Sequence, residues 1–483
     1  MWASGSIHWN SDRRGTSFSE RSMISVMNNC KTRCRRFLVL VVFMAVMLSA
    51  FCPPHSALGK VYIDIDSPAF QKFPIAITDF RKISQQGYQG ELSSWFSDTL
   101  AKYLEMTGFF NIISKKAFLE DQKQAGLTVE SIRFADWAVI GAEYLVKGSF
   151  QSNGKDITAE FYLFDVIKGE VITAKQYTGK IEDKTEMVRK FAGEILSALT
   201  GDEGVFGTKI AFVLKKVLNV PGKNKLAEIV SDIYTINFDG TEFLRITNFQ
   251  SLTLSPRWSP DGKFISFTSY RNGNPDLYIR SMNGAKVEKI ANFDGINLAG
   301  SWSRDGRKLL LTLSKDGNEE IYAMDLSSRN LERLTHDFAI DVSPAWSPDN
   351  RRIAFVSNRS GSPQIFTMDT TGNDVKRLTY DGSYNTSPSW SPRGNRIAYE
   401  GLVNKRFQIF SVNEDGSNPL QLTFDNVDHE SPSWSPDARY LVFSTRGGGK
   451  HRICVMNANG SNVRVLYENA VGCISPSWSP KIK

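Results

Sequence analysis

The stretch SPAWSPDNRRIAFVSN, residues 343–358, decides the fold. Two prolines flank Trp346, and an apolar run follows at once. The phrase recurs as SPRWSPDGK, GSWSRDGRK, SPSWSPRGN, SPSWSPDAR and SPSWSPKIK, and each of its tryptophans follows the previous one by 44 residues. They are Trp258, Trp302, Trp346, Trp390, Trp434 and Trp478. Because a fixed period of about 40–45 residues is typical of propeller blades, the sequence predicts a β-propeller.

Two further ladders of large side chains keep the same step of 44 residues. One holds Tyr234, Tyr278, Tyr322, Phe366, Phe410 and Cys454, and the other holds Phe267, Leu311, Phe355, Tyr399 and Phe443. Three ladders in one register are not an accident of composition. They indicate a repeated structural unit with three fixed core positions.

Within one repeat the pattern predicts four short strands, at 344–347, 352–357, 364–369 and 375–379. The segments between them are rich in Pro, Asp, Asn and Gly, which favour turns. The run 353–356 is apolar on both faces, as expected for a sheet covered on each side. Proline cannot donate to a strand ladder, so we expect the Pro-x-Trp-Ser-Pro segment at the inner edge of a blade, with its indole between adjacent blades.

The number of blades follows from the number of strands of each kind. Strands of the tryptophan type occur six times, and strands of the Ile-Ala-Phe type also occur six times, beginning with residues 209–213. The first repeat lacks its own tryptophan strand. We therefore expect residues 475–480 to complete the blade that begins at Lys209, closing a six-bladed ring without exposed edges.

The first 57 residues differ from the rest. Basic residues, four of them within 31–36, precede a 15-residue apolar run at 37–51, which is short for a membrane span and typical of a signal peptide. We expect cleavage after Ala57, with an uncleaved anchor as the alternative. Residues 1–57 carry seven basic and two acidic residues, so the mature chain has 51 basic against 49 acidic residues. No basic stripe remains to suggest nucleic-acid binding.

Residues 58–206 predict a small α/β domain, and residues 207–483 the propeller. Strands are expected at 61–65, 75–80, 139–150, 157–166 and 171–177, and an amphipathic helix at 91–106. Asp183 with Glu186 resembles a capping box that opens a second helix. The fold class is therefore a two-domain chain with a small α/β amino-terminal domain followed by an all-β six-bladed propeller. No proline-rich linker separates the domains, so we expect them to pack on each other.

The sequence offers little catalytic chemistry. The mature chain has three histidines, His336, His429 and His451, and none has a partner at metal-ligand spacing. There is no nucleophile elbow, phosphate-binding loop or Cys-x-x-Cys motif. We therefore expect no enzyme activity, cofactor or metal. Cys454 and Cys473 are expected to be two independent thiols, with a disulfide as the alternative.

The repeats differ most in the loops that lead into the tryptophan strands. These loops, at 249–254, 293–299, 338–342, 381–386, 425–430 and 469–474, vary in composition while their length stays fixed. The first blade also carries an 11-residue insertion around 215–228, which we expect on the same face. Loops held by a rigid scaffold are a common place for binding, so this face is the expected binding surface.

With these features together, the chain resembles the TolB family, whose members are periplasmic components of the Tol–Pal system of Gram-negative envelopes. The resemblance covers residues 58–483 and rests on the signal peptide, the α/β domain and the repeats. The stretch 137–142 (WAVIGA) and the strand 61–65 contribute to it. The resemblance implies a monomeric, non-enzymatic periplasmic scaffold that associates with the envelope through its partners. It would support outer-membrane integrity and cell division.

The resemblance also implies partners and site residues. The propeller would bind the lipoprotein Pal through Ile296, Asn297, Ala299, Asp341, Val342, Asn385, His429 and Glu430. The amino-terminal segment would bind TolA and act as a switch through Lys60, Val61, Tyr62, Ile63, Asp64 and Ile65. We expect Ala299 and Val342 to lie outside the blade cores. The alternative function is a periplasmic propeller that binds or cleaves oligosaccharides, for which His429 is the candidate group.

Overall fold

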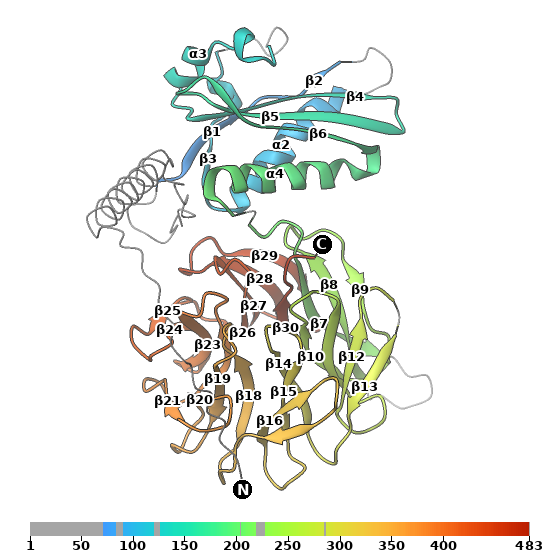
Figure 1. Cartoon of the computed structure of the whole chain (residues 1–483), viewed down its shortest axis with the longest axis vertical. Helices are drawn as coiled ribbons and strands as arrows, with labels where there is room; N and C mark the ends of the chain where they lie inside the picture. The colour runs from blue at the N-terminus through green and yellow to red at the C-terminus, as the bar shows by residue number, and fades with distance from the viewer. Residues whose placement is uncertain are drawn as a thin grey trace, which may run out of the picture. The chain divides into compact units, whose positions relative to one another are not determined.

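The computed structural model describes residues 71–83, 90–119, 126–202, 204–218, 228–284 and 286–482 (Figure 1). The expected signal peptide, the strand at 61–65 and the switch segment 60–65 lie outside these residues. Within the described part of the chain, no helix is long and apolar enough to cross a membrane.

The amino-terminal domain is built on a six-stranded mixed sheet. Its strands run β3-β1-β4-β5-β6, and β2 also pairs with β4. The pairs of β1 with β3 and β4 are parallel, whereas β4–β5 and β5–β6 are antiparallel. The strands are β1 (Phe73–Ile77), β2 (Arg81–Lys82), β3 (Phe110–Ile112), β4 (Tyr144–Ser152), β5 (Asp156–Asp165) and β6 (Glu170–Lys180).

Helices cover both faces of this sheet because its strands alternate apolar side chains to each side. Helices α2 (Gly90–Met106) and α4 (Lys184–Thr200) pack on the face that carries Ile75 and Val146 (Figure 1). The neighbouring residues Ala76 and Leu145 point to the other face, where they pack around Trp137 of α3 (Phe134–Val139). Three short 3₁₀ turns complete the domain, η1 (Lys115–Ala117), η2 (Val129–Ser131) and η3 (Ile181–Asp183).

Two expectations for this domain are wrong in detail. The strand expected at 139–150 begins only at Tyr144, because residues 134–139 form helix α3 and bury Trp137. The capping box expected from Asp183 and Glu186 is not formed. The Asp183 carboxylate instead accepts the backbone N–H of Lys180 at 3.0 Å, one turn earlier, inside the 3₁₀ turn that leads into α4.

The propeller has six blades, each a four-stranded antiparallel sheet. Blade 1 contains β30 (Cys473–Trp478), β7 (Lys209–Leu218), β8 (Glu228–Asn237) and β9 (Leu244–Arg245). Blade 2 contains β10 (Thr253–Trp258), β11 (Phe264–Ser269), β12 (Asp276–Ser281) and β13 (Val287–Ala291). Blade 3 contains β14 (Asn297–Trp302), β15 (Lys308–Leu313), β16 (Glu320–Asp325) and β17 (Leu331–Arg333).

The remaining blades follow the same order. Blade 4 contains β18 (Asp341–Trp346), β19 (Arg352–Ser357), β20 (Gln364–Asp369) and β21 (Lys376–Arg377). Blade 5 contains β22 (Asn385–Trp390), β23 (Arg396–Val403), β24 (Arg406–Asn413) and β25 (Leu420–Gln421). Blade 6 contains β26 (Asp428–Trp434), β27 (Tyr440–Gly447), β28 (Lys450–Asn457) and β29 (Arg464–Asn469). The second and third strands expected in the repeat are confirmed, while the first starts earlier and the fourth is shorter than expected.

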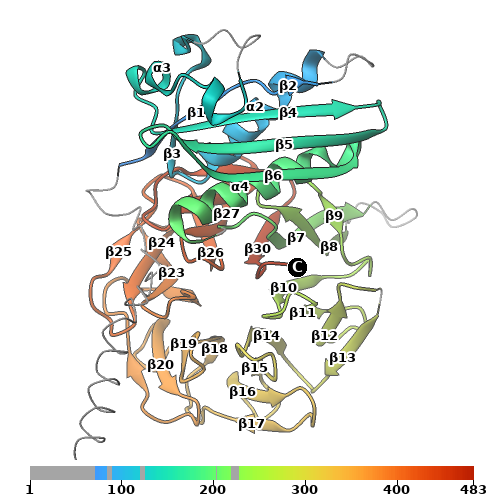
Figure 2. The same ribbon diagram turned by 45° about the horizontal axis from the view of Figure 1, so that its top comes forward.

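The ring closes as the strand count predicts. Strand β30, from the end of the chain, pairs with β7 and completes blade 1. In every blade the tryptophan strand ends the sheet and pairs with one other strand only. Figure 2 shows β10, β14, β18, β26 and β30 on the inner side of the ring. The prolines of these strands therefore lie at a protected edge, where a missing N–H interrupts no ladder.

The inner strand of every blade has a register shift against the second strand, and in five blades it falls at a serine. The serine before each proline has a left-handed backbone, with φ between 53° and 57°, at Ser255, Ser343, Ser387, Ser431 and Ser475. Blade 3 has Ala299-Gly300 instead of Ser-Pro. There Ala299 stays in the ladder opposite Leu311. A Cβ at Gly300 would lie 2.8 Å from the Leu310 carbonyl oxygen, so this position requires glycine.

The indoles lie between adjacent blades, as expected. Trp434 of blade 6 donates from Nε1 to the Ser389 carbonyl of blade 5 at 3.0 Å. Trp302 of blade 3 donates to the Ser266 hydroxyl of blade 2 at 3.0 Å. Five of the six tryptophans are buried, and Trp302 alone is partly exposed. Cys454 and Cys473 are both buried free thiols, which confirms that expectation.

Hydrogen bonds join the α/β domain to blades 1 and 6. Tyr103 of α2 and Arg189 of α4 both donate to the Asp239 carboxylate of blade 1, at 2.7 and 3.1 Å. In blade 6 the Tyr440 hydroxyl donates to the Thr107 carbonyl at 2.7 Å in a buried contact. The two domains therefore pack on each other through turns of the propeller that lie opposite the expected binding face.

Candidate partner-binding face

The connections that lead from one blade into the inner strand of the next lie on one face of the propeller. We call them the entering loops; they are residues 246–252, 292–296, 334–340, 378–384, 422–427 and 470–472. The long hairpin of blade 1 reaches the same face, with β7 and β8 paired as far as Leu218 and Glu228. The tip of the insertion lies outside the described residues.

A ring of buried side chains lies where these loops become strands. It repeats every 44 residues as Thr253, Asn297, Asp341, Asn385, His429 and Cys473, and each member is at most 4% exposed. Four of the predicted site residues belong to this ring. Their side chains are turned into the protein, so they shape the binding face from beneath it and present no surface of their own.

The asparagines of the ring hold their loops by hydrogen bonds. Asn297 donates from Nδ2 to the carbonyl of Phe293 at 2.7 Å, and its Oδ1 accepts the N–H of the same residue. Asn385 donates to the Asp381 carbonyl at 2.8 Å and to Gln364 Oε1 at 2.8 Å. Each asparagine satisfies loop groups that would otherwise be buried without partners.

The charged members of the ring are also engaged. Asp341 is fully buried and pairs with Arg359 at 2.7 Å, and its burial raises the pKa of this carboxyl. His429 Nε2 lies 2.5 Å from the Asp425 carboxylate, and its ring packs edge-on against Phe443. Among the described residues, no group of three or more His, Cys, Asp or Glu side chains could hold a metal ion.

Glu430 lies one residue beyond the ring and is half-buried. Burial raises the pKa of its carboxyl, and Arg446 lies 3.9 Å away. Asp428 is buried beside it and receives both Arg446 and Arg406, at 3.1 and 3.3 Å. This part of the face therefore carries a small ionic network between blades 5 and 6.

The expectation that Ala299 lies outside the blade cores is wrong. It is 7% exposed and belongs to the apolar core that includes Leu311. In blade 3 the register shift falls after Ala299, one residue later than in the other blades, so residue 299 stays in the ladder opposite Leu311 and is buried. Val342 is half-buried and packs against the core that contains Trp390. A charge at Ala299 would therefore test the fold and not binding.

The exposed surface of this face is a set of apolar side chains, of which only Ile296 was predicted from the sequence. One residue before each buried member, the loops of blades 2 to 5 present Leu252, Ile296, Ile340 and Tyr384. Leu252, Ile340 and Tyr384 are 37%, 45% and 39% exposed, Ile296 is half-buried, and Phe338 is fully exposed beside them. We call these five residues the apolar rim. The 44-residue spacing of Leu252, Ile296, Ile340 and Tyr384 is a signal in the sequence for four of them, and Phe338 lies outside this spacing.

The central channel opens within this rim. Part of it forms a cavity of about 220 Å³ lined by inner-strand residues of several blades. Most lining groups are small, with Ser343, Ser387 and Ser431 among them. Arg257 supplies the guanidinium of the channel, and burial lowers its pKa. The wall of the channel is therefore largely polar and carries one guanidinium.

One carboxyl group links the second strand of blade 5 to the inner strand of blade 6. Glu400 of blade 5 is 8% exposed and accepts the N–H of Ser431 in blade 6 at 2.5 Å. This N–H belongs to a bulged serine, so Glu400 supplies an acceptor that the interrupted ladder does not. Burial raises the pKa of Glu400 to about 7. An unfolded glutamate has a pKa of about 4.3, so the folded chain holds this proton more tightly.

This shift predicts a pH-dependent stability. The contribution of Glu400 is fully present below about pH 4 and is lost as pH rises through about 7. Glu400→Gln keeps an acceptor without the charge, so it should raise the free energy of unfolding at pH 8 by roughly 1–3 kcal/mol and change little at pH 4. Urea unfolding at both pH values measures this. The control is Glu332→Gln on an exposed strand. An equal effect at both pH values would contradict the assignment.

Comparison with known proteins now places the chain. A family model described as the TolB beta propeller domain matches residues 196–482, and one described as the TolB amino-terminal domain matches residues 61–172. The chain belongs to the TolB family. This assignment is to a family of Tol–Pal components and not to an enzyme family.

Individual relatives agree with the family. The chain is 52% identical over 243 residues to the Tol-Pal system protein TolB of Syntrophus aciditrophicus, covering 49% of this chain and 51% of the relative. It is 38% identical over 234 residues to that of Desulfosudis oleivorans, covering 48% and 51%. The chain thus spans about half the length of the curated relatives it matches. The crystal structure of TolB from Acinetobacter baumannii is similar at 28% identity, with a TM-score of 0.72, covering 85% of this chain and 97% of that one.

Proposed function

We propose that this chain is a non-enzymatic, periplasmic scaffold of the Tol–Pal system that binds the lipoprotein Pal through the apolar rim and the channel mouth. Membership of the TolB family supports the assignment of this chain to the Tol–Pal system. The role in outer-membrane integrity and cell division follows from the same proposal. It acts as a link between envelope layers and carries out no reaction.

The observation that carries the proposal is the pairing of an exposed ring with a buried one. The apolar rim places large side chains in water around the mouth of a channel. Directly beneath it, Asn297 and Asn385 of the buried ring hold their loops by hydrogen bonds, and Asp341 is fixed by an ion pair with Arg359. Exposed apolar side chains on rigid loops suit a protein interface, because little conformational entropy is lost on binding.

The predicted site residues take two roles in this proposal. Ile296 belongs to the rim, Val342 packs against the core that contains Trp390, and Glu430 lies in the ionic network of blades 5 and 6. Asn297, Asp341, Asn385 and His429 would act indirectly, by positioning the rim. The segment 60–65 is proposed to bind TolA, and its support is the family resemblance.

Calorimetry against purified Pal tests the rim directly. Ile340→Asp and Tyr384→Asp each place an unpaired charge in the centre of the proposed interface, so each should weaken binding by at least about 2 kcal/mol. Both side chains are exposed, so the thermal midpoint should stay within a few degrees of the parent value. The matched control is Ser327→Asp, in the exposed turn between β16 and β17 on the opposite face.

The outcomes separate the alternatives. Equal binding by both rim variants and the control would move the Pal site elsewhere on the chain. No binding by the parent protein would contradict the proposed partner and return weight to an oligosaccharide ligand.

A further inference from the structure

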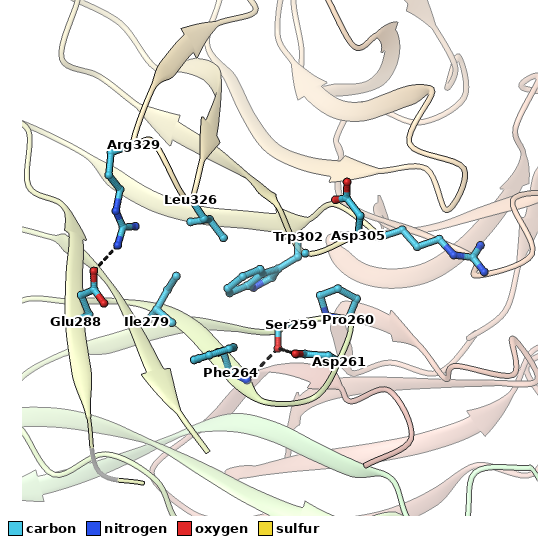
Figure 3. Close-up of a pocket in the computed structure, with 12 residues that line it drawn as sticks. Ser259, Pro260, Asp261, Phe264, Ile279, Glu288, Trp302, Asp305, Leu326 and Arg329 are labelled. Carbon is cyan, nitrogen blue, oxygen red and sulfur yellow. Dashed lines mark hydrogen bonds and ion pairs between the residues drawn. The ribbon is translucent and has the colours of Figure 1, made fainter. Parts of the chain in front are cut away.

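A second surface lies away from the proposed Pal site. Between blades 2 and 3, on the face opposite the entering loops, the chain forms a cavity of about 420 Å³. Its floor is apolar and consists of Phe264, Ile279, Trp302 and Leu326, which converge in Figure 3. Arg329 and Glu288 form an ion pair at its rim. We call this cavity the 2/3 groove.

The repeats show that this floor is unusual. The four positions of the floor can be followed to the other junctions by steps of 44 residues. Polar or small residues replace three of the four at three junctions: Lys308, Ala323 and Thr370 at 3/4, Arg352, Thr367 and Glu414 at 4/5, and Arg396, Ser411 and Ala458 at 5/6, beside the tryptophan in each. At the 1/2 junction, where the 11-residue insertion shifts the first position, Lys209 and Thr235 are polar and Met282 is apolar. Ring closure therefore does not require an apolar floor.

One other junction has four large apolar residues, and it is covered. At the 6/1 junction the same positions hold Tyr440, Val455, Trp478 and Phe238. The α/β domain lies on them: Met106 packs against this cluster, and the Tyr440 hydroxyl bonds to the Thr107 carbonyl. At the 6/1 junction the apolar floor is thus covered by another part of the chain.

No described residue covers the 2/3 groove in this way. Phe264 is 38% exposed, whereas Tyr440 at the equivalent position is 3% exposed. Ile279, Trp302 and Leu326 are also partly exposed. Apolar side chains gathered in an open cavity mark a site of interaction more often than scattered exposed ones do.

The charged groups at the edge of the 2/3 groove indicate what kind of ligand it could bind. The carboxylate of Asp305 accepts the Ser303 hydroxyl at 2.6 Å, and Glu288 is paired with Arg329. Arg304 is different: its guanidinium is exposed, donates to the Pro348 carbonyl at 3.1 Å and forms no ion pair among the described residues. Asp261 also brings a carboxylate to the groove, and like Asp305 it accepts a serine hydroxyl of its own turn at 2.6 Å. Arg304 is therefore the cation at the groove that can pair with an acidic group of a ligand.

Arg304 is also held in place. It replaces the proline that the other five repeats have at this position, so it has a backbone N–H. That N–H donates to Asn350 Oδ1 at 2.8 Å, and Asn350 itself takes the left-handed position where three other repeats have glycine. The two departures from the repeat pattern fit each other and fix the arginine at the mouth of the groove.

We propose that the 2/3 groove binds a peptide segment of a protein partner, which inserts one large apolar side chain above Trp302 and places a carboxylate on Arg304. The volume lies within the range of cavities that hold ligands and has room for one or two such side chains. Phe264 lacks the hydroxyl of Tyr440, so the inserted side chain needs no acceptor at that point. This site is separate from the proposed Pal face and would allow both partners to bind at once.

The test uses variants copied from neighbouring blades. The double variant Phe264→Lys, Ile279→Thr introduces residues that this propeller already has at equivalent positions. They are Lys308 at the 3/4 junction and Thr367 at the 4/5 junction, so the fold should tolerate both changes. A random 12-residue peptide library displayed on phage is selected on the wild-type mature protein and, in parallel, on this double variant. The control protein is Lys308→Ala at the 3/4 junction. Thermal unfolding confirms that all three are folded.

We expect the wild type and the control to enrich one motif, a large apolar residue with a nearby Asp or Glu, and the double variant not to enrich it. In fluorescence anisotropy the enriched peptide should bind the double variant at least tenfold more weakly. Arg304→Gln should weaken binding about threefold to fivefold, and this loss should vanish when the acidic residue of the peptide is an amide.

Other outcomes would overturn the proposal. Enrichment of the same motif by the double variant, or no motif on the wild type, would show that the groove is not a peptide site. A wild-type dimer in sedimentation equilibrium that the double variant dissolves would mean that a second copy of the chain fills the groove. Peptide binding that appears only after residues 58–70 are removed would mean that the chain fills it with its own segment.

Discussion

Removing residues 471–483 should unfold the propeller as a whole. These residues contain β30, which pairs with β7 through Cys473–Trp478 and closes the ring. Their loss exposes the edge of β7 and removes Trp478, whose indole donates to Thr208 at 2.9 Å. A large buried aromatic alone is worth roughly 3–5 kcal/mol, and domains are stable by only about 5–15 kcal/mol. We expect no cooperative thermal transition in circular dichroism.

A peptide supplied separately provides the control for this deletion. Adding a synthetic peptide of residues 471–483 to the shortened chain should restore the transition, because the missing strand can pair with β7 from solution. A shortened chain that melts at the parent midpoint without the peptide would contradict closure through β30.

Trp434→Ala should cost roughly 3–5 kcal/mol of unfolding free energy. Trp434 is 6% exposed, lies in an apolar core of blades 5 and 6, and donates to the Ser389 carbonyl. Its removal leaves a cavity between two blades and an acceptor without a donor. Urea denaturation of the variant, with the slope compared to the parent, measures the loss.

Trp302→Ala is the matched comparison, because Trp302 is the equivalent tryptophan of blade 3. Its indole is partly exposed in the 2/3 groove, so it removes less buried surface and the loss should be clearly smaller. An equal loss of unfolding free energy in the two variants would contradict the description of the 2/3 junction as an open groove.

The propeller could be predicted because its signal is repeated. Any one repeat is ambiguous, but six copies of Trp, Phe and Tyr at a step of 44 residues fix the strands and their order. The α/β domain lacks this redundancy. Residues 134–139 are apolar enough for a strand, and only their packing around Trp137 in the folded domain makes them a helix.

The candidate site was predicted as a face but not as a set of contacts. Loop position locates the entering loops, yet side-chain direction depends on the bulge at each Ser-Pro. Because the repeat runs in strict register, Asp341 and Asn385 turn inward while their neighbours Ile340 and Tyr384 turn out. Ala299 follows neither rule, since the register shift of blade 3 comes only after residue 299. These directions come from backbone geometry that no single sequence window encodes.

Hydrogen–deuterium exchange of the mature chain with and without purified Pal tests directly whether Pal binds through the apolar rim. We expect slower exchange in the entering loops of blades 2 to 5, at 246–252, 292–296, 334–340 and 378–384, with the turns at 282–284 and 326–330 unchanged. Protection confined to those turns, or none in the entering loops at saturating Pal, would contradict it.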